Sequence, residues 1–467
     1  MLTRHCRQSL LTLVALLAPT LVTAQGGRFD LDKTKTVLTG LIEDAIKQRG
    51  VPSISIALVR GDSIVWKSAF GYANVRTKTP ATTETIYSTG STFKSATATA
   101  LMQLQEQGKF SLDHPVNRYL GDIRVQDRLQ AEKPVTFTHM LSHWSGLTAG
   151  AVTKPIWGRE LPKPLEKMVS ELYSVRPPET TWEYNNFAYG MAGLLVQKIS
   201  GMEYEKYMLE NVLKPLGVTI DHPVYPSPEM VELMALPYMP GGPNGKPTPV
   251  AQVHFDVYPA GDIYLTPEDM ARFLAMHLND GVFRGKRIIS AASAKKMREP
   301  QFGGVYGFGF TIRKDSVGHT IISHGGGIPG QSSFMMGDVD AKVGVYFMSN
   351  SGAPTSIATA AIALLRGDDY KAPTPKKAVK VDPKILDKYA GNYQLTPDVV
   401  WTIVREGDGL ARMPVGGGTK TPLLAETATR FFIEGQDLTI TFVMNPSGSV
   451  EKLELDTGGG SLSAKRK

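Results

Sequence analysis

Apolar residues that recur at intervals of three and four predict several helices in the first 365 residues. Glycine follows three of these segments, at Gly50, Gly108 and Gly201, where a helix C-terminus favours that residue. The predicted helices cover residues 37–46, 91–107, 187–200 and 355–365. The proline-rich stretch 150–181 predicts loops instead of long regular structure, and ordered loops of this length often wall a site.

Period-two alternation and short apolar runs predict strands in two separate regions. Residues 54–58 and 64–72 flank Arg60-Gly61-Asp62 and predict a hairpin, in which we interpret the Arg-Gly-Asp string as a plain turn. Beyond residue 383 the apolar runs become short and are separated by turn residues, which predicts a small antiparallel β-domain. The predicted strands of this domain are residues 401–405, 431–433, 438–442 and 450–455, and a buried strand is predicted before the linker at 344–348.

Composition divides the chain into a large folded unit, a linker and a small unit. An apolar fraction of 42% and a charged fraction of 20% in 467 residues exclude a disordered or coiled-coil chain. Residues 366–383 contain Gly, Asp, Pro and Lys with few apolar residues, as linkers do. We therefore expect a catalytic-sized domain at residues 25–365, a linker at 366–383 and a β-domain at 384–467. The net charge of +7, with no dense Lys/Arg block, predicts no nucleic-acid partner.

The first 24 residues have the pattern of a secretory signal peptide. Arg4 and Arg7 precede an apolar run, and small residues favour cleavage after Ala24. The run is shorter than the roughly 20 residues that a membrane span needs. Cleavage also removes Cys6, the only cysteine, which excludes disulfides, a thiol nucleophile and a thiolate metal site in the mature protein. The sequence thus predicts a periplasmic or secreted protein without a stable membrane span.

Ser91 and Lys94, in the string Ser-Thr-Phe-Lys, are the first candidates for chemistry. A serine three residues before a lysine on a helix places both side chains on one face, so that the lysine can accept the serine proton. A serine at a helix start also offers its backbone N–H to a developing oxyanion. The same spacing recurs at Ser293 and Lys296, in a Lys- and Arg-rich stretch that we interpret as solvated surface.

Tyr184 and Asn186 are the second candidates. They stand between the proline-rich stretch and the helix at 187–200, so both can face a cleft from a turn. A phenol close to a lysine ammonium has its ionised form favoured, and we expect Tyr184 to serve as a general base near neutral pH. Tyr72 and Asn74 have the same spacing but end the predicted hairpin, which indicates a structural role.

The string His324-Gly325-Gly326-Gly327 follows a predicted strand at 320–322 and is the third candidate. Consecutive glycines let the backbone approach a ligand without a Cβ in the way. A bare glycine turn explains such a string equally well, so the string alone does not assign a site.

The order of these elements, Ser-x-x-Lys, Tyr-x-Asn and His-x-Gly, resembles the penicillin-recognising serine hydrolases. This family includes class C β-lactamases, D-Ala-D-Ala carboxypeptidases, D-aminopeptidases and β-lactamase-like esterases. The resemblance covers about residues 30 to 365. Further strings that look like family landmarks are Gly108-Lys109 with Leu112-Asp113-His114-Pro115-Val116, Leu141-Ser142-His143-Trp144-Ser145-Gly146-Leu147, Pro259-Ala260-Gly261-Asp262, Tyr306-Gly307-Phe308-Gly309 and Ser349-Asn350.

The resemblance implies an α+β fold of the β-lactamase/transpeptidase type, in which helices flank an antiparallel sheet and a helical lobe is added. The stretch 386–455, with the string Tyr-Ala-Gly-Asn-Tyr at 389–393, resembles the antiparallel lipocalin-like β-domain appended to some relatives. In relatives such a domain can edge the active site or mediate assembly, whereas we interpret it here as a stabilising addition.

The resemblance also implies a role for each candidate residue. Ser91 would be the acylated nucleophile, Lys94 and Tyr184 would share the proton transfers, and Gly327 would supply the second oxyanion N–H. Histidine in the third motif, where β-lactamases of this fold usually carry lysine, argues against efficient β-lactamase activity. The substrate-binding residues implied are Asn186, for the acyl-side amide, with His324, Gly326 and Gly327.

We therefore expect an exported serine hydrolase that cleaves an amide or ester bond through a Ser91 acyl-enzyme, with no metal or organic cofactor. Among small substrates, peptides, including those with D-residues, rank first, simple esters second and β-lactams third. A function of another class is a penicillin-binding sensor or cell-wall binding protein without significant turnover, and the three intact motifs argue against it. The sequence assigns no oligomeric state.

His139 and His143 lie four residues apart, a spacing that suits a zinc pair on a helix face. No glutamate stands between them, and no third ligand is evident. Because the family landmark covers the same residues, we interpret both imidazoles as structural.

Overall fold

The structure of the chain, a computed structural model, describes residues 28–148, 155–157, 164–220, 224, 226–239, 246–371, 376–396, 399–413, 420–433, 438–456 and 461–467. The predicted signal at residues 1–24 lies outside the described residues. Within the described ranges, no helix combines the length and the apolar character needed to cross a membrane.

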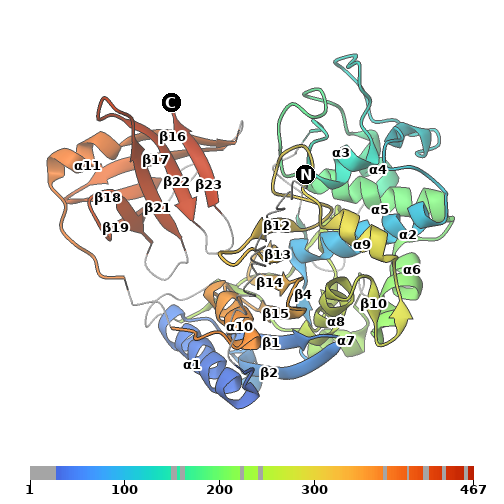
Figure 1. Ribbon diagram of the computed structural model, residues 1–467, viewed down its shortest axis with the longest axis horizontal. Helices are drawn as coiled ribbons and strands as arrows, with labels where there is room; N and C mark the ends of the chain where they lie inside the picture. Colours follow the sequence, from blue (N-terminus) through green and yellow to red (C-terminus); the bar gives the residue numbers. More distant parts are fainter. Residues whose placement is uncertain are drawn as a thin grey trace, which may run out of the picture.

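A seven-stranded antiparallel sheet forms the centre of the large domain (Figure 1). Its strand order is β12-β13-β14-β15-β1-β2-β3, so the last strand of the domain along the chain, β15, pairs with the first, β1. The strands are β1 Ser53–Arg60, β2 Ser63–Asn74, β3 Thr79–Pro80, β12 Thr311–Lys314, β13 Thr320–Ile328, β14 Gln331–Asp338 and β15 Val343–Ser349.

The large domain contains ten α-helices among its described residues, some of which cover the two faces of this sheet while others form a lobe beside it. The long ones are α1 Leu31–Arg49, α2 Lys94–Glu106, α5 Asn186–Ser200, α8 Pro267–Leu278 and α10 Ser356–Arg366. The short ones are α3 Phe137–Leu141, α4 Leu165–Ser170, α6 Tyr204–Tyr207, α7 Pro228–Leu233 and α9 Ala291–Met297.

The pleat of β1 divides two hydrophobic clusters between the two faces. Ile54, Ile56 and Leu58 join the cluster that α1 and α10 complete. Ala57 and Val59 point the other way, into the larger cluster that contains α2, α5 and α8. Because both faces are covered, β1 is buried along its length apart from its last residue. This explains why the positions between its larger apolar residues hold small residues, such as Ser55 and Ala57, instead of charged ones.

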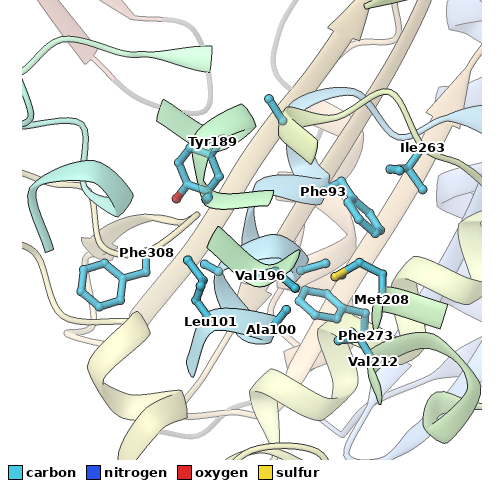
Figure 2. Packing of buried hydrophobic residues seen from close by; sticks show 14 of the residues in the cluster. Phe93, Ala100, Leu101, Tyr189, Val196, Met208, Val212, Ile263, Phe273 and Phe308 are labelled. Carbon is cyan, nitrogen blue, oxygen red and sulfur yellow. The ribbon is translucent and has the colours of Figure 1, made fainter. Parts of the chain in front are cut away.

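The helical lobe packs around α2 and α5. Figure 2 shows Phe93 and Leu101 from the α2 segment, Tyr189 and Val196 from α5, and Phe273 from α8 in one cluster. All five side chains are fully buried. The alanines and threonines of α2 let α5 approach closely. Helix α2 is therefore a core helix, although it holds few large apolar residues.

The four predicted helices are confirmed, with shifted ends. Helix α1 begins at Leu31, six residues earlier than the apolar spacing predicts, because the Asp30 side chain accepts the N–H of Lys33 and caps the helix. The helix predicted at 91–107 begins as a 3₁₀ turn, Gly90–Phe93, and continues as α2.

A closed antiparallel barrel of eight strands follows, which confirms the predicted β-domain. Aromatic rings, among them Tyr389, Tyr393 and Phe442, pack its interior together with helix α11 Pro383–Tyr389. Sequence patterning predicted four of its strands and missed β16, β18, β19 and β23. The strands are β16 Gly391–Thr396, β17 Val399–Glu406, β18 Gly409–Met413, β19 Thr421–Ala425, β20 Arg430–Phe432, β21 Thr439–Met444, β22 Val450–Asp456 and β23 Ser461–Arg466.

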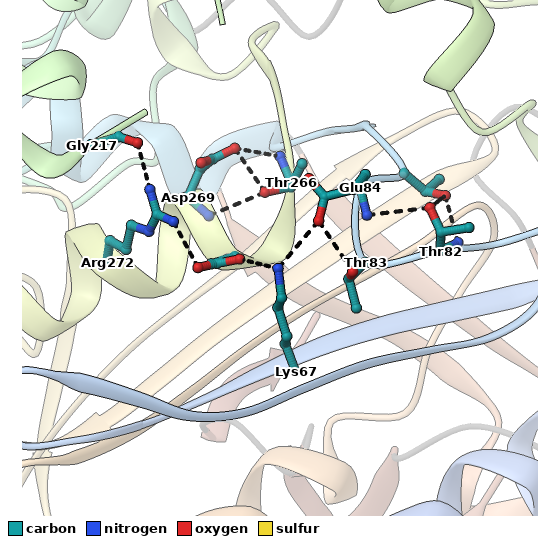
Figure 3. A network of polar contacts seen from close by, with 10 residues as sticks. Lys67, Thr82, Thr83, Glu84, Gly217, Thr266, Asp269 and Arg272 are labelled. Carbon is teal, nitrogen blue, oxygen red and sulfur yellow. Dashed lines mark hydrogen bonds and ion pairs between the residues drawn. The ribbon is translucent and has the colours of Figure 1, made fainter. Parts of the chain in front are cut away.

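A charged network fastens β2 to the start of α8 (Figure 3). The Lys67 Nζ lies 2.5 Å from a carboxylate oxygen of Glu268 and 3.2 Å from one of Glu84. Arg272, one turn along α8, lies 2.7 Å from Glu268 and donates to the carbonyl of Gly217. Because the Lys67 side chain is 38% exposed, solvent screens these pairs, and the network orients the elements more than it stabilises them.

We expect Phe273→Ala to lower the free energy of unfolding by about 3–5 kcal/mol, because removing a fully buried ring leaves a cavity in the core. Urea denaturation followed by circular dichroism measures the loss. Val317→Ala is the control: its side chain is 68% exposed, and a change within about 0.5 kcal/mol is expected. A loss for Phe273→Ala as small as that of the control would contradict this packing.

Candidate active site

Ser91 and Lys94 lie in contact at the junction of the sheet and the helical lobe. The Ser91 Oγ lies 3.0 Å from the Lys94 Nζ, which also donates to the carbonyl of Ala260 at 2.7 Å. Lys94 is fully buried, and this burial lowers the pKa of its amine well below the ordinary value. A neutral amine has a lone pair, so Lys94 can accept the proton of the Ser91 hydroxyl.

Three glycines, two from the landmark strings and one from the His-x-Gly motif, let neighbouring backbone approach this turn. A Cβ on Gly261 would lie 2.7 Å from the Ser91 nitrogen, and one on Gly309 would lie 2.9 Å from the Lys94 carbonyl carbon. A Cβ on Gly326 would lie 2.3 Å from a backbone carbonyl oxygen just before the turn. These distances are too short for real side chains, so the glycines are required by packing around the turn.

Tyr184 approaches the pair from the turn before α5. The Lys94 Nζ lies 4.9 Å from the centroid of its ring. The Tyr184 hydroxyl is buried and makes no hydrogen bond of normal geometry with the described residues, although the nearby Ser91 hydroxyl acts to lower its pKa. Burial outweighs this effect and raises the pKa of Tyr184 well above its ordinary value.

The expectation of an ionised Tyr184 near neutral pH is therefore wrong. It assumed a permanent ammonium on Lys94, whereas burial disfavours the charged forms of both groups. A neutral hydroxyl can still move a proton, because it donates one while it accepts another.

Asn185 and Asn186 have different tasks at the start of α5. The Asn185 side chain accepts the N–H of Ala188 at 3.0 Å and caps the helix, and its amide donates to the carbonyl of Leu147. Asn186 is the first helical residue, is half-buried and lines the cleft. The two-residue spacing of Tyr184 and Asn186 thus results from a capping residue placed between them.

His324 lies on β13 with both ring nitrogens engaged. Its Nδ1 lies 2.7 Å from the carbonyl of Gly325, so Nδ1 carries the hydrogen, and its Nε2 accepts from the Tyr306 hydroxyl at 2.7 Å. Burial, with a smaller contribution from the neighbouring Lys94, lowers the pKa of His324 to about 3. The ring is therefore neutral at physiological pH. Sequence reasoning missed Tyr306 as a site residue, although its Tyr-Gly-Phe-Gly string was noted.

Three of the seven predicted site residues line one cleft, and Lys94, Tyr184 and His324 lie outside its described lining. Ser91, Asn186 and Gly327 line it, whereas Gly326 packs beneath the turn. A Cβ on Gly90 would lie 2.5 Å from the Gly327 nitrogen, so the backbone nitrogens of Ser91 and Gly327 border the same space. The other described lining residues are mainly small or apolar: Gly90, Phe255, Val257, Ala260, Gly261, Asp262 and Ile328.

The strings with matching spacing lie away from this cleft. Ser293 is buried in α9, so the interpretation of this string as solvated surface is wrong for the serine, whereas Lys296 is partly exposed and pairs with Glu299 at 3.4 Å. Tyr72 is exposed, and the Asn74 side chain accepts backbone N–H groups in the turn that follows β2.

His139 and His143 have separate partners. The His139 Nε2 lies 2.9 Å from a carboxylate oxygen of Glu179, whereas the His143 Nδ1 accepts the N–H of Asn185 at 3.1 Å. The His143 ring also packs against Tyr184, with 4.4 Å between centroids. Sequence spacing missed this contact because its members are far apart along the chain.

A sheet and helical lobe of this topology, with a serine–lysine turn at their junction, are features of the penicillin-recognising serine hydrolase superfamily. The chain belongs to the beta-lactamase family, since the family model described as Beta-lactamase matches residues 38–367. A second model, described as Domain of unknown function (DUF3471), matches residues 375–464, over the barrel.

Curated and solved relatives agree with this family. A penicillin-binding protein of Bacillus subtilis (strain 168) is 25% identical over 441 residues, which cover 85% of this chain and 94% of the relative. The structure of the octameric penicillin-binding protein homologue from Pyrococcus abyssi has a TM-score of 0.62 at 25% identity, and covers 93% of this chain and 100% of that one. D-amino acid amidase from Ochrobactrum anthropi SV3 shares the fold, with a TM-score of 0.58 at 24% identity over 72% of this chain and 97% of its own.

We expect Lys94→Met to be more stable than the wild type at neutral pH, by on the order of 1 kcal/mol, because it removes the disfavoured burial of an amine. The folded pKa of Lys94 lies below the unfolded one, so the unfolded chain holds the extra proton between these values. Wild-type stability then rises with pH, and the advantage of Lys94→Met should shrink towards about pH 10. Urea denaturation across this pH range measures it.

Lys67→Met is the control of opposite sign. Hydrogen bonding to Glu268 raises the pKa of Lys67, so its charged form stabilises the folded state at neutral pH and its removal should destabilise the protein. If Lys94→Met loses stability at neutral pH as Lys67→Met does, the amine of Lys94 is not a neutral buried group.

Proposed function

We propose that the protein is an exported serine hydrolase that cleaves an amide or ester bond through an acyl-enzyme on Ser91. The observation that carries this proposal is the 3.0 Å contact between the Ser91 hydroxyl, at the wall of a cleft, and the fully buried Lys94 amine. Export is proposed from the pattern of residues 1–24 alone.

In the acylation step the Ser91 Oγ attacks the substrate carbonyl carbon while the Lys94 amine takes the hydroxyl proton. The carbonyl π electrons move to its oxygen, which the backbone N–H groups of Ser91 and Gly327 stabilise. Tyr184 donates its proton to the leaving nitrogen or oxygen as the C–N or C–O bond breaks. The Lys94 proton then restores the tyrosine hydroxyl. Water attacks the acyl carbon in the second half, with the same groups moving protons in reverse.

Neutral Tyr184 and neutral Lys94 fit this proton path. Burial favours the neutral form of the Tyr184 phenol and of the Lys94 amine. A proton that passes from Lys94 to Tyr184 after the first half-reaction therefore leaves neither group charged. Asn186, at the cleft wall, would bind the acyl-side amide of the substrate.

We rank peptides and amides, including those of D-residues, above simple esters and β-lactams. The ring of His324 is neutral, so it provides no cation for a substrate carboxylate. This disfavours β-lactams, and among peptides and amides it favours those without a free C-terminal carboxylate. The shared fold with a D-amino acid amidase supports the same order by analogy.

We expect Ser91→Ala to lower turnover by on the order of 10⁴-fold or more, because no other group replaces the nucleophile. Labelling with a fluorescent fluorophosphonate or penicillin, followed in time, measures it alongside substrate hydrolysis. Ser293→Ala is the matched control and should label as the wild type does.

Label that persists on Ser91→Ala would refute Ser91 as the acylated residue. Label that persists on the wild type without product release would favour a sensor over an enzyme.

We expect hydrolysis of D-amino-acid amides and D-Ala-D-Ala peptides to exceed that of short p-nitrophenyl esters, with a chromogenic cephalosporin slowest. Parallel initial rates of the purified protein compare these substrates. Rapid cephalosporin turnover with no peptide or amide cleavage would reverse this ranking.

A further inference from the structure

His143 lies behind Tyr184 and does not line the cleft. Its side chain is only 1% exposed, and its ring packs between those of Tyr184 and Tyr306, at centroid distances of 4.4 and 4.7 Å. The described lining of the cleft does not include it, so His143 is not placed to touch a substrate.

Two hydrogen bonds join His143 to the backbone on both sides of Tyr184. Its carbonyl accepts the N–H of Glu183 at 2.9 Å, and its Nδ1 accepts the N–H of Asn185 at 3.1 Å. Tyr184 is the residue between these two. A single residue thus holds the Trp182–Glu183 peptide, the Tyr184–Asn185 peptide and one face of the Tyr184 ring.

The backbone of His143 adopts an unusual conformation to make these contacts. Its φ is +66°, in the left-handed region that non-glycine residues seldom occupy. Such a conformation persists where surrounding contacts determine it. Here those contacts are the two hydrogen bonds to the Tyr184 turn, which sits about forty residues further along the chain.

The hydrogen bond from Asn185 also determines the protonation state of the ring. Because Nδ1 accepts an N–H, it carries no proton, and Nε2 holds the hydrogen of a neutral imidazole. Nε2 is buried and has no hydrogen-bond partner among the described residues. Burial and then the neighbouring Lys94 and His324 lower the pKa of His143 well below its ordinary value. Protonation at Nδ1 would break the bond to Asn185.

We propose that His143 is a positioning residue: its carbonyl and its neutral imidazole hold the backbone on both sides of Tyr184, and so keep the tyrosine hydroxyl beside Ser91 and Lys94. This inference rests on the proposed function, since it acts through the proton transfers of Tyr184. It assigns no contact with substrate to His143.

Three substitutions separate the hydrogen bond from the ring. His143→Asn places an amide oxygen at the position of Nδ1 and tolerates positive φ, whereas His143→Phe keeps a ring and lacks the acceptor. His143→Gln supplies the same amide one carbon further out, where it misses Asn185. The measurements are kcat and KM on the panel substrate that the wild type turns over fastest, the rate of fluorophosphonate labelling, and Tm.

We expect His143→Phe and His143→Gln to lower kcat and the labelling rate by about tenfold or more, with KM within about threefold, because the lost contact orients the tyrosine and not the substrate. His143→Asn should keep kcat within about threefold of the wild type. Wild-type activity in both His143→Phe and His143→Gln, or a loss in His143→Asn equal to theirs, would overturn the inference.

His277→Phe is the matched control for general loosening of the core. His277 is another fully buried histidine of this domain, with its Nε2 3.1 Å from the Thr99 hydroxyl and its ring against Phe273 and Phe310. It should lose Tm and keep kcat, and a kcat loss like that of His143→Phe would assign the effect to stability. If His143→Phe does not fold, the Gln and Asn pair decides alone.

Ser91→Ala in the same series separates this inference from the proposed function. Activity that survives Ser91→Ala refutes the proposed function and the inference with it. Activity that depends on Ser91 but tolerates both His143→Phe and His143→Gln refutes the role of His143 alone.

Discussion

The burial of the Lys94 amine is the constraint on which the rest of the site depends. The amine is fully buried and contacts the Ser91 hydroxyl and the Ala260 carbonyl, and no carboxylate pairs with it among the described residues. An unpaired ammonium in such a place is costly, so the amine gives up its proton. Around it, Tyr184, His143 and His324 are all held in their neutral forms. A site built this way needs close packing, because water that reached the amine would restore its charge.

Glycines of the landmark strings and of the His-x-Gly motif provide that packing. Gly261, Gly309 and Gly326 come from three segments far apart in the sequence, and each lies so near the Ser91 turn that a Cβ would collide with backbone. Their shared task explains why the strings occur together with the Ser-x-x-Lys motif. Glycines in a sequence indicate a close approach of backbone, but not what is approached. At these three positions the structure shows that it is the Ser91 turn of the protein itself.

The sequence predicted what depends on local pattern and missed what depends on distant contacts. Helical periodicity located α1, α2, α5 and α10, and the α+β fold with its β-domain is confirmed. The start of α1 was missed because it is set by the cap at Asp30, and half of the barrel strands were missed because closure of the barrel, not apolar alternation, pairs them. The ionisation of Tyr184 was wrong in direction because proximity to lysine is visible in a motif and burial is not. His143 and Tyr306 are part of the landmark strings, yet their hydrogen-bond partners Asn185 and His324 are identified only by the fold.

Histidine at position 324 changes how the lysine must be kept neutral. A lysine that kept its charge there would repel an ammonium on Lys94, and this repulsion between like charges would favour loss of the Lys94 proton. With a neutral His324, that help is gone, and burial alone accounts for the low pKa of the Lys94 amine. The Tyr306 hydroxyl and the Gly325 carbonyl hydrogen-bond both nitrogens of His324, and burial keeps its ring neutral. Close packing around Lys94 and the neutral His324 therefore belong together. Because burial already lowers the pKa of the Lys94 amine, the site needs no neighbouring cation to favour loss of its proton.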